Sequence, residues 1–297
     1  MRHLTCYGIL LLLFSLVALG CQEGPGAASA EADWPAEQTA AAQERLMASD
    51  GGQLVLEAIE AHGGLAAWYN APTSSYAWEY SNEGSNIRFK SVLVADNRTR
   101  HVYHDLVELG TPDNPQPIEG RFAWDGKDAW ISPDTLQGPN PRFWATTGYY
   151  FESIPFILAD PGLQYERLPD EMLDGQTYQL VKVGYDDGVG DSPGDTYTLY
   201  VHPETKQVFA IRYTVTYGRG RPAPDQTVRQ TLFYYEDYVT VDGLTVAQRF
   251  RGFNWEDGGV TTFKNEAWAS DISFTQPFDA SRLEMPENGR VQPLPGE

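Results

Sequence analysis

Cysteine is almost absent from the sequence, which limits the chain's covalent structure and its chemistry. Only Cys6 and Cys21 occur among 297 residues. Cys6 falls in an N-terminal segment that we expect to be removed, so the mature chain keeps one cysteine and cannot form an internal disulfide. A cysteine-rich zinc site is excluded for the same reason, because such sites need several thiolates.

Positive charge is also scarce. Lysine and arginine total 21 against 41 aspartate and glutamate residues, a formal net charge of −20, and only five of the basic residues are lysine. Nucleic acids and anionic membrane surfaces are bound through basic faces. The composition therefore predicts no nucleic-acid partner.

Several motifs of common enzyme classes are missing. The sequence has no His-Glu-x-x-His zinc motif, no phosphate-binding P-loop and no dinucleotide fingerprint. We therefore expect no enzymatic activity and no cofactor. A hydrolase whose site leaves no sequence signature stays as the third alternative.

Two groups of residues are candidate metal ligands. His101 and His104 lie three apart on a predicted strand, where such positions face opposite sides, so we expect surface histidines and no metal. A glycine-rich loop carries four aspartates: Asp186, Asp187, Asp191 and Asp195. Their oxygens suit Ca²⁺, but their spacing is not that of an EF-hand. We expect a solvated acidic loop, with calcium as the alternative.

The longest apolar run is too short to cross a membrane and instead indicates export. It extends from Gly8 to Leu19 and follows the positive Arg2, as in a signal peptide. It ends in Val-Ala-Leu-Gly-Cys, which resembles a bacterial lipobox. Residues 1–20 are therefore predicted to be a lipoprotein signal peptide, and Cys21 is predicted to be acylated through its thiol. Several acyl chains anchor a protein firmly, whereas one chain binds only marginally.

The residues after Cys21 bear on location. The start of the chain resembles Gram-negative lipoproteins, in which a residue such as Gln22, in place of Asp, indicates the outer membrane. Residues 21–49 are rich in Ala, Glu and Gly, and we interpret them as a tether. Because acylation consumes Cys21, no catalytic thiol remains. The predicted location is the cell envelope, with the lipid anchor in the outer membrane.

Residue patterns from position 50 predict a β protein with capping helices. Asp50 is the expected N-cap of a helix that Gly63 and Gly64 end. From residue 73 onward, apolar and polar residues alternate with the period of a strand. Asp-Gly pairs at residues 125, 174, 242 and 257 separate such runs and predict hairpins. We predict one curved antiparallel sheet over residues 50–297, an open half-barrel of roughly ten or eleven strands.

One segment, residues 139–162, interrupts the strand pattern. It is rich in aromatic residues and in proline, and it predicts one or two short helices inserted over the open face of the sheet. Aromatic side chains in or just before it are the candidate ligand-binding residues: Trp124, Trp130, Phe143, Trp144, Tyr149, Tyr150, Phe151 and Phe156. Either they line an apolar cavity or they simply fill a core.

Three segments resemble known exported lipoproteins. Residues 60–68 resemble the helix-Gly-Gly-Trp opening of many such proteins. Residues 124–130 resemble the aromatic-Asp-Gly-Lys-x-x-Trp hairpin of the LolA/LolB lipoprotein-carrier superfamily, and residues 200–208 resemble its Asp-Pro-x-Thr turn, with His202 in place of Asp. Residues 158–162 and 188–193 are similar to an uncharacterised branch of these lipoproteins.

The resemblance implies an open β half-barrel capped by helices, with an apolar concave face. In the carriers this face holds acyl chains, and the resemblance implies no catalysis. Our first hypothesis is therefore an outer-membrane lipoprotein that binds an apolar ligand, either a lipid or the acyl chains of a lipidated protein. The alternative is a non-catalytic interaction protein whose half-barrel is filled by its own side chains.

Overall fold

The computed structural model describes residues 26–192, 194–219, 221–223, 226 and 228–294, with side chains from residue 33 onward. The predicted signal peptide and Cys21 lie outside the described residues. Residues Pro35–Glu297 form one compact unit, which contains every strand of the sheet.

Helix α1 (Gly26–Met47) covers most of the segment predicted as a tether. Ala42 and Leu46 on its last turns are fully buried, and the Arg45 guanidinium donates a hydrogen bond to the Ala159 carbonyl at 2.8 Å. The end of this helix is therefore packed against the folded unit.

Two shorter helices, α2 (Asp50–Ala61) and α3 (Leu65–Asn70), follow. The N-cap of α2 is Ser49, one residue before the predicted Asp50, because its Oγ accepts a hydrogen bond from the Gly52 N–H at 3.1 Å. Gly63 and Gly64 both have positive φ and separate the two helices, as predicted.

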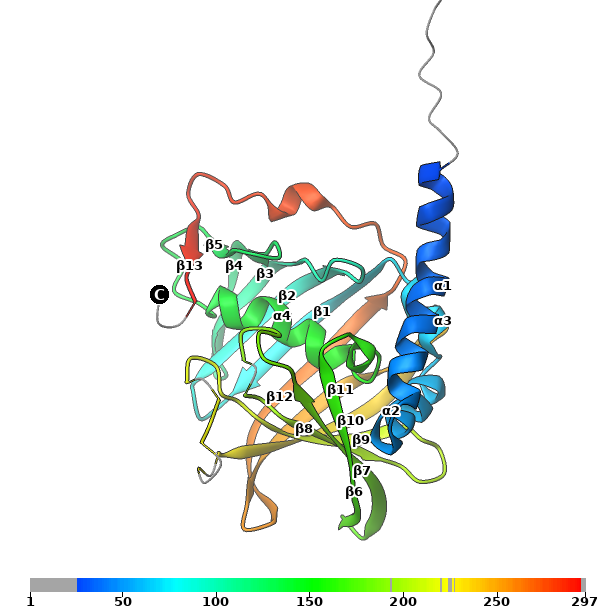
Figure 1. Cartoon of the computed structure of the whole chain (residues 1–297). Helices are drawn as coiled ribbons and strands as arrows, with labels where there is room; N and C mark the ends of the chain where they lie inside the picture. The colour runs from blue at the N-terminus through cyan, green and yellow to red at the C-terminus, as the bar shows by residue number, and fades with distance from the viewer. Residues whose placement is uncertain (1–25, 193, 220, 224–225, 227, 295–297) are drawn as a thin grey trace, which may run out of the picture. The chain divides into compact units, whose positions relative to one another are not determined.

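The protein is mainly β, with one open, curved antiparallel sheet (Figure 1). Thirteen strands are described in place of the predicted ten or eleven. They are β1 (Thr73–Asn82), β2 (Ile87–Asp96), β3 (Val102–Thr111), β4 (Asn114–Trp124), β5 (Ala129–Ser132), β6 (Leu163–Leu173), β7 (Gln176–Tyr185), β8 (Tyr197–Val201), β9 (Val208–Thr214), β10 (Gln230–Val241), β11 (Leu244–Glu256), β12 (Gly259–Ser273) and β13 (Arg290–Gln292).

The strand order explains why a helix must cross the sheet. It runs β13-β5-β4-β3-β2-β1-β12-β11-β10-β9-β8-β7-β6, so two meanders meet where β1 pairs with β12. β5 and β6 are consecutive in sequence but lie near opposite edges. The chain between them, which contains helix α4 (Pro141–Glu152) and the 3-10 turn η1 (Phe156–Ala159), therefore traverses the inner face of the sheet.

All four Asp-Gly pairs lie at hairpin turns, as predicted. They connect β4 to β5, β6 to β7, β10 to β11 and β11 to β12. The glycine has a positive φ in each, and the aspartate does in the last three, which is the conformation that a tight two-residue turn requires.

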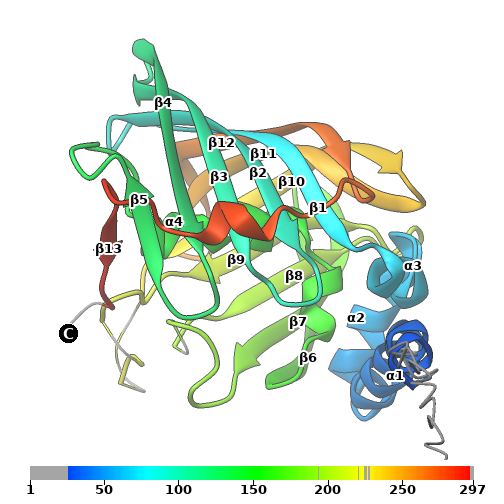
Figure 2. The same ribbon diagram turned by 90° about the horizontal axis from the view of Figure 1, so that it is seen from above.

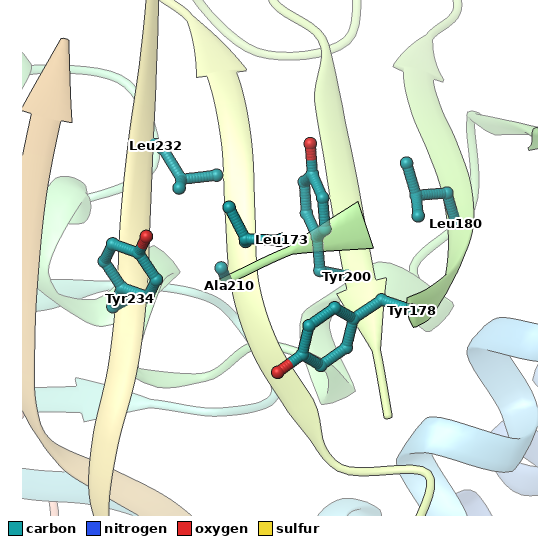
Figure 3. Close-up of a cluster of buried hydrophobic side chains, with 7 residues drawn as sticks. All are labelled: Leu173, Tyr178, Leu180, Tyr200, Ala210, Leu232 and Tyr234. Atoms are coloured by element: carbon teal, nitrogen blue, oxygen red, sulfur yellow. The ribbon is translucent and has the colours of Figure 1, made fainter. Parts of the chain in front are cut away.

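The outer face of β2–β5 is covered by a different segment. The 3-10 turn η2 (Ala280–Leu283) and its flanking residues lie across it, on the side opposite α4 (Figure 2). A second cluster packs buried apolar side chains of β6–β10: Leu173, Tyr178, Leu180, Tyr200, Ala210, Leu232 and Tyr234 (Figure 3). This cluster also lies on the outer face, because Leu232 and Tyr234 flank Phe233 in β10 and Phe233 points to the inner face under α4.

Candidate ligand cavity

A cavity of about 710 Å³ lies between α4 and the inner face of the sheet. Its volume is within the range of small-molecule sites, roughly 300–1,000 Å³. The sheet contributes mainly aromatic side chains to the wall, among them Trp78, Tyr80, Tyr197, Tyr213 and Phe233. The half-barrel is therefore not filled by its own side chains, which argues against the alternative of a filled interaction protein.

Six of the eight candidate aromatic residues line this cavity: Trp124, Phe143, Trp144, Tyr149, Tyr150 and Phe151. Trp144 packs against Tyr80 and Phe89, with ring centroids 4.4 and 5.2 Å apart. Phe151 contacts Phe233 in the same way, at 5.1 Å. The structure thus brings these residues together around one space, and their binding of a ligand stays a prediction.

Trp130 lies on the other face of the sheet and does not line the cavity. It pairs with Ala123 across the β4–β5 hairpin, and successive residues of a strand face opposite sides, so Trp130 is opposite in orientation to Trp124. It packs with Tyr103 beneath the η2 segment, and its Nε1 donates to the Leu283 carbonyl at 2.9 Å. Trp130 is therefore part of the packing under η2 and not of the cavity wall.

Phe156 is also outside the cavity. It follows α4 in η1, is fully buried, and stacks on Trp68 of α3 with centroids 5.0 Å apart. Phe156 therefore packs the segment between β5 and β6 against the N-terminal helices.

Both nitrogens of His104 are used to fix α4 to the sheet. Nε2 donates to the Ala145 carbonyl of α4 at 2.9 Å, and Nδ1 accepts from Ser91 Oγ at 2.9 Å. Burial lowers the pKa of His104 to about 3, so the imidazole is neutral. The prediction of a surface histidine was wrong for His104, because its side chain points to the inner face of the sheet and is fully buried. His101 precedes β3 and contacts Trp124 instead.

The C-terminal half of α4 is held by further buried contacts. Tyr235 donates its hydroxyl proton to the Phe151 carbonyl at 2.8 Å. Glu152 at the end of the helix is fully enclosed, and burial raises its pKa to about 8. The hydrogen bond from Tyr235 therefore fixes the end of α4 to β10.

The first turn of α4 is held by a cap and by a bidentate ion pair at the cavity wall. Asn140 caps the helix by accepting from the Arg142 N–H at 2.9 Å. The Arg142 guanidinium in turn pairs with Asp191 of the β7–β8 loop, with Nε–Oδ2 at 2.5 Å and Nη2–Oδ1 at 2.9 Å. Both residues line the cavity, so this ion pair links α4 to the loop at the cavity wall.

The acidic loop uses its carboxylates for separate partners. Asp186 accepts from Gln164, Asp187 from Arg221 and Asp191 from Arg142. Asp195 is buried and accepts from the Thr216 hydroxyl at 2.8 Å; burial raises its pKa to about 6. Within the described ranges, no group of three or more His, Cys, Asp or Glu side chains is arranged to hold a metal ion.

This loop also contains a Gly-x-Ser-x-Gly spacing at residues 190–194, which the sequence analysis did not single out. In hydrolases that motif sits on a sharp strand-to-helix turn. Here it connects two strands, β7 and β8. His62 and His104 are both buried with their ring nitrogens engaged by backbone or Ser91, so neither serves as a base for Ser192.

Three polar side chains of the cavity wall were also not predicted: Asn82, Lys264 and Asn265. Asn82 ends β1, whereas Lys264 and Asn265 lie on β12, and the orientation of these two depends on the register of β12, which the alternation pattern does not reveal. Among the helices described from residue 26 onward, none is long and apolar enough to span a membrane.

Comparison with solved structures identifies the fold. A LolA-superfamily protein from Nitrosomonas europaea superimposes with a TM-score of 0.50, covering 80% of this chain and 98% of its own, at 10% identity. A DUF1329-family protein from Desulfovibrio piger gives a TM-score of 0.52, covering 79% and 97%, at 9% identity. The fold is LolA-like.

The LolA-like fold agrees with the resemblance seen in the sequence. Sequence comparison adds nothing further, since no family model and no curated protein matches the chain. At about one residue in ten identical, the structural similarity concerns the fold alone.

Proposed function

We propose that this protein is an envelope lipoprotein whose cavity binds the apolar part of a lipid or of a lipidated protein. The cavity of about 710 Å³ beneath α4 carries the proposal. Tyrosine and tryptophan suit such a wall because each has an apolar body and a polar edge. Each methylene that leaves water for this wall contributes about 0.8 kcal/mol.

The proposed anchor is a set of acyl chains on Cys21, in the outer membrane. The support is the lipobox-like end of the apolar run, followed by Gln22. An anchored domain with an apolar cavity is suited to holding lipid chains near a membrane, and the proposed role is binding without catalysis.

The test uses the mature chain with Cys21→Ser, which carries no acyl group of its own, and a fluorescent fatty-acid analogue. Trp144→Ala removes a ring that lines the cavity and packs on Tyr80. We expect roughly tenfold weaker binding, because a lost aromatic contact costs on the order of 1–2 kcal/mol. The matched control is Trp255→Ala, since Trp255 stacks with Arg212 on the outer face. Equal binding by both variants, or none by the parent, contradicts the proposal.

A further inference from the structure

An irregularity in β12 turns a lysine into the cavity. In the pairing of β11 with β12, Gly252 lies opposite Asn265 and Phe253 lies opposite Phe263. Lys264 is therefore an extra residue, a β-bulge. Neighbouring strand residues normally face opposite sides, but Lys264 and Asn265 both line the cavity. Bulges re-aim side chains in this way and are common beside functional sites.

Lys264 differs from the two arginines of the cavity wall because its hydrogen-bond partner is neutral, whereas theirs are carboxylates. Arg100 pairs with Asp160, with Nη2–Oδ1 at 2.5 Å, and Arg142 pairs with Asp191. The Lys264 Nζ donates to the neutral Thr231 hydroxyl at 2.7 Å. Within the part of the chain that the structure describes, no carboxylate forms an ion pair with it.

The surroundings of Lys264 favour an anion. The side chain is half-buried, and desolvation lowers its pKa, as does the nearby positive charge of Arg229. A cation that is partly removed from water and repelled by a second cation is stabilised when an anion binds beside it. Lys264 is one of five lysines in a chain of net charge −20, so its position inside the cavity is unusual for this composition.

A second polar group of the cavity wall is bound by Asn265, the residue next to the lysine. The Tyr80 hydroxyl accepts hydrogen bonds from the Nδ2 atoms of Asn82 and Asn265, at 3.0 and 2.9 Å. All three residues line the cavity. Because both amides donate to the oxygen, the hydroxyl proton of Tyr80 is directed away from them and is available to an acceptor.

We propose that the cavity binds an amphiphile with an anionic head, a carboxylate or a phosphate, and that Lys264 and the Tyr80 hydroxyl bind this head. The aromatic wall under α4 then holds the tail. This inference rests on the proposed function and adds the chemical class of the ligand. Charge-assisted hydrogen bonds of this kind are about twice as strong as neutral ones.

The experiment measures binding of two matched pairs of probes to the mature Cys21→Ser chain. Palmitate is compared with hexadecanol, and palmitoyl lysophosphatidate with monopalmitoyl glycerol. We expect the anionic member of one or both pairs to bind roughly 10- to 100-fold more tightly. The pair that shows the difference tells whether the head is a carboxylate or a phosphate.

Lys264→Met keeps the apolar stem and removes the charge. It should abolish the preference for the anionic probe and leave binding of the neutral probe within about twofold. The matched control is Lys182→Met, because Lys182 pairs loosely with Glu166 at 3.6 Å, away from the cavity. Equal affinity for both members of each pair, or equal loss of both in Lys264→Met, overturns the anionic head while leaving an apolar site. Failure of every probe to bind overturns the proposed function itself.

Discussion

Three ionisable side chains, Glu152, His104 and His62, are fully buried, and burial favours the neutral form of each. Glu152 lies at the end of α4, where burial raises its pKa to about 8. The native state therefore binds more protons than the unfolded state between pH 4.5 and about 8, and stability falls as pH rises through that window. Burial lowers the pKa values of His104 and His62 to about 3 and 4, so below pH 6.5 their contribution to stability falls as pH falls.

We predict that Glu152→Gln raises stability at alkaline pH. The amide is neutral at every pH, so the variant avoids the cost of ionising a buried carboxyl, roughly 1–3 kcal/mol at pH 8–9. The advantage should shrink toward pH 5. Urea unfolding across pH 5–9 measures this, with Glu166→Gln, an exposed glutamate, as the control. A variant advantage that does not depend on pH would show that Glu152 is not the group that titrates.

A residue-scale limit of sequence reasoning is seen at Trp124 and Trp130. Both belong to one predicted hairpin, and the hairpin was correctly predicted from Asp125-Gly126. Which of the two tryptophans faces the cavity depends on the strand register. A shift of the register by one residue turns every side chain of a strand to the opposite face of the sheet. Lys264 was missed for a related reason: a bulge is set by pairing with the neighbouring strand and leaves no local pattern.

At the scale of elements, the first turn of α4 is held differently from the rest of the helix. His104 and Tyr235 bind the backbone of its middle and end from inside the sheet. Its beginning is held through the ion pair of Arg142 with Asp191. The Arg142 side chain is 10% exposed and the pair is bidentate, so it contributes more than the roughly 0–1 kcal/mol of a surface pair. Both residues line the cavity, so this pair is the link that a ligand meets at the wall.

We expect Arg142→Gln to speed the entry and release of an apolar probe several-fold and to lower the unfolding free energy by roughly 1.5–3 kcal/mol, with the strands staying folded. The reason is that the first turn of α4 loses its link to the β7–β8 loop. Stopped-flow fluorescence measures both rates. The control is Arg221→Gln, which removes the more exposed pair with Asp187 in the same loop. Unchanged rates in Arg142→Gln would mean that ligand enters elsewhere.

Much of the sheet was predictable because strong local signals coincide with its turns. The four Asp-Gly pairs adopt positive φ at the glycine and mark four hairpins correctly. The strand count was low in part because β13 has only three residues, too few to show an alternation pattern.

At the scale of the whole molecule, the proposed anchor at Cys21 precedes the folded unit that contains the cavity. We predict that Cys21→Ser prevents acylation, because lipid transfer requires a thiolate and a serine hydroxyl is a far weaker nucleophile near neutral pH. Labelling cells with radioactive palmitate checks this. Equal label in the variant and the parent would contradict the proposed anchor and leave the cavity unaffected.

The central claim is that the space under α4 holds lipid. Native mass spectrometry of the mature Cys21→Ser chain, purified without detergent, tests it most directly. Thr147→Trp should fill the cavity, since Thr147 lines it, whereas Thr177→Trp adds the same ring at an exposed position of β7. We predict one lipid-sized adduct per chain in the parent and in Thr177→Trp, and its loss in a folded Thr147→Trp. Absence of any adduct from the parent, or an undiminished adduct in folded Thr147→Trp, would contradict the claim.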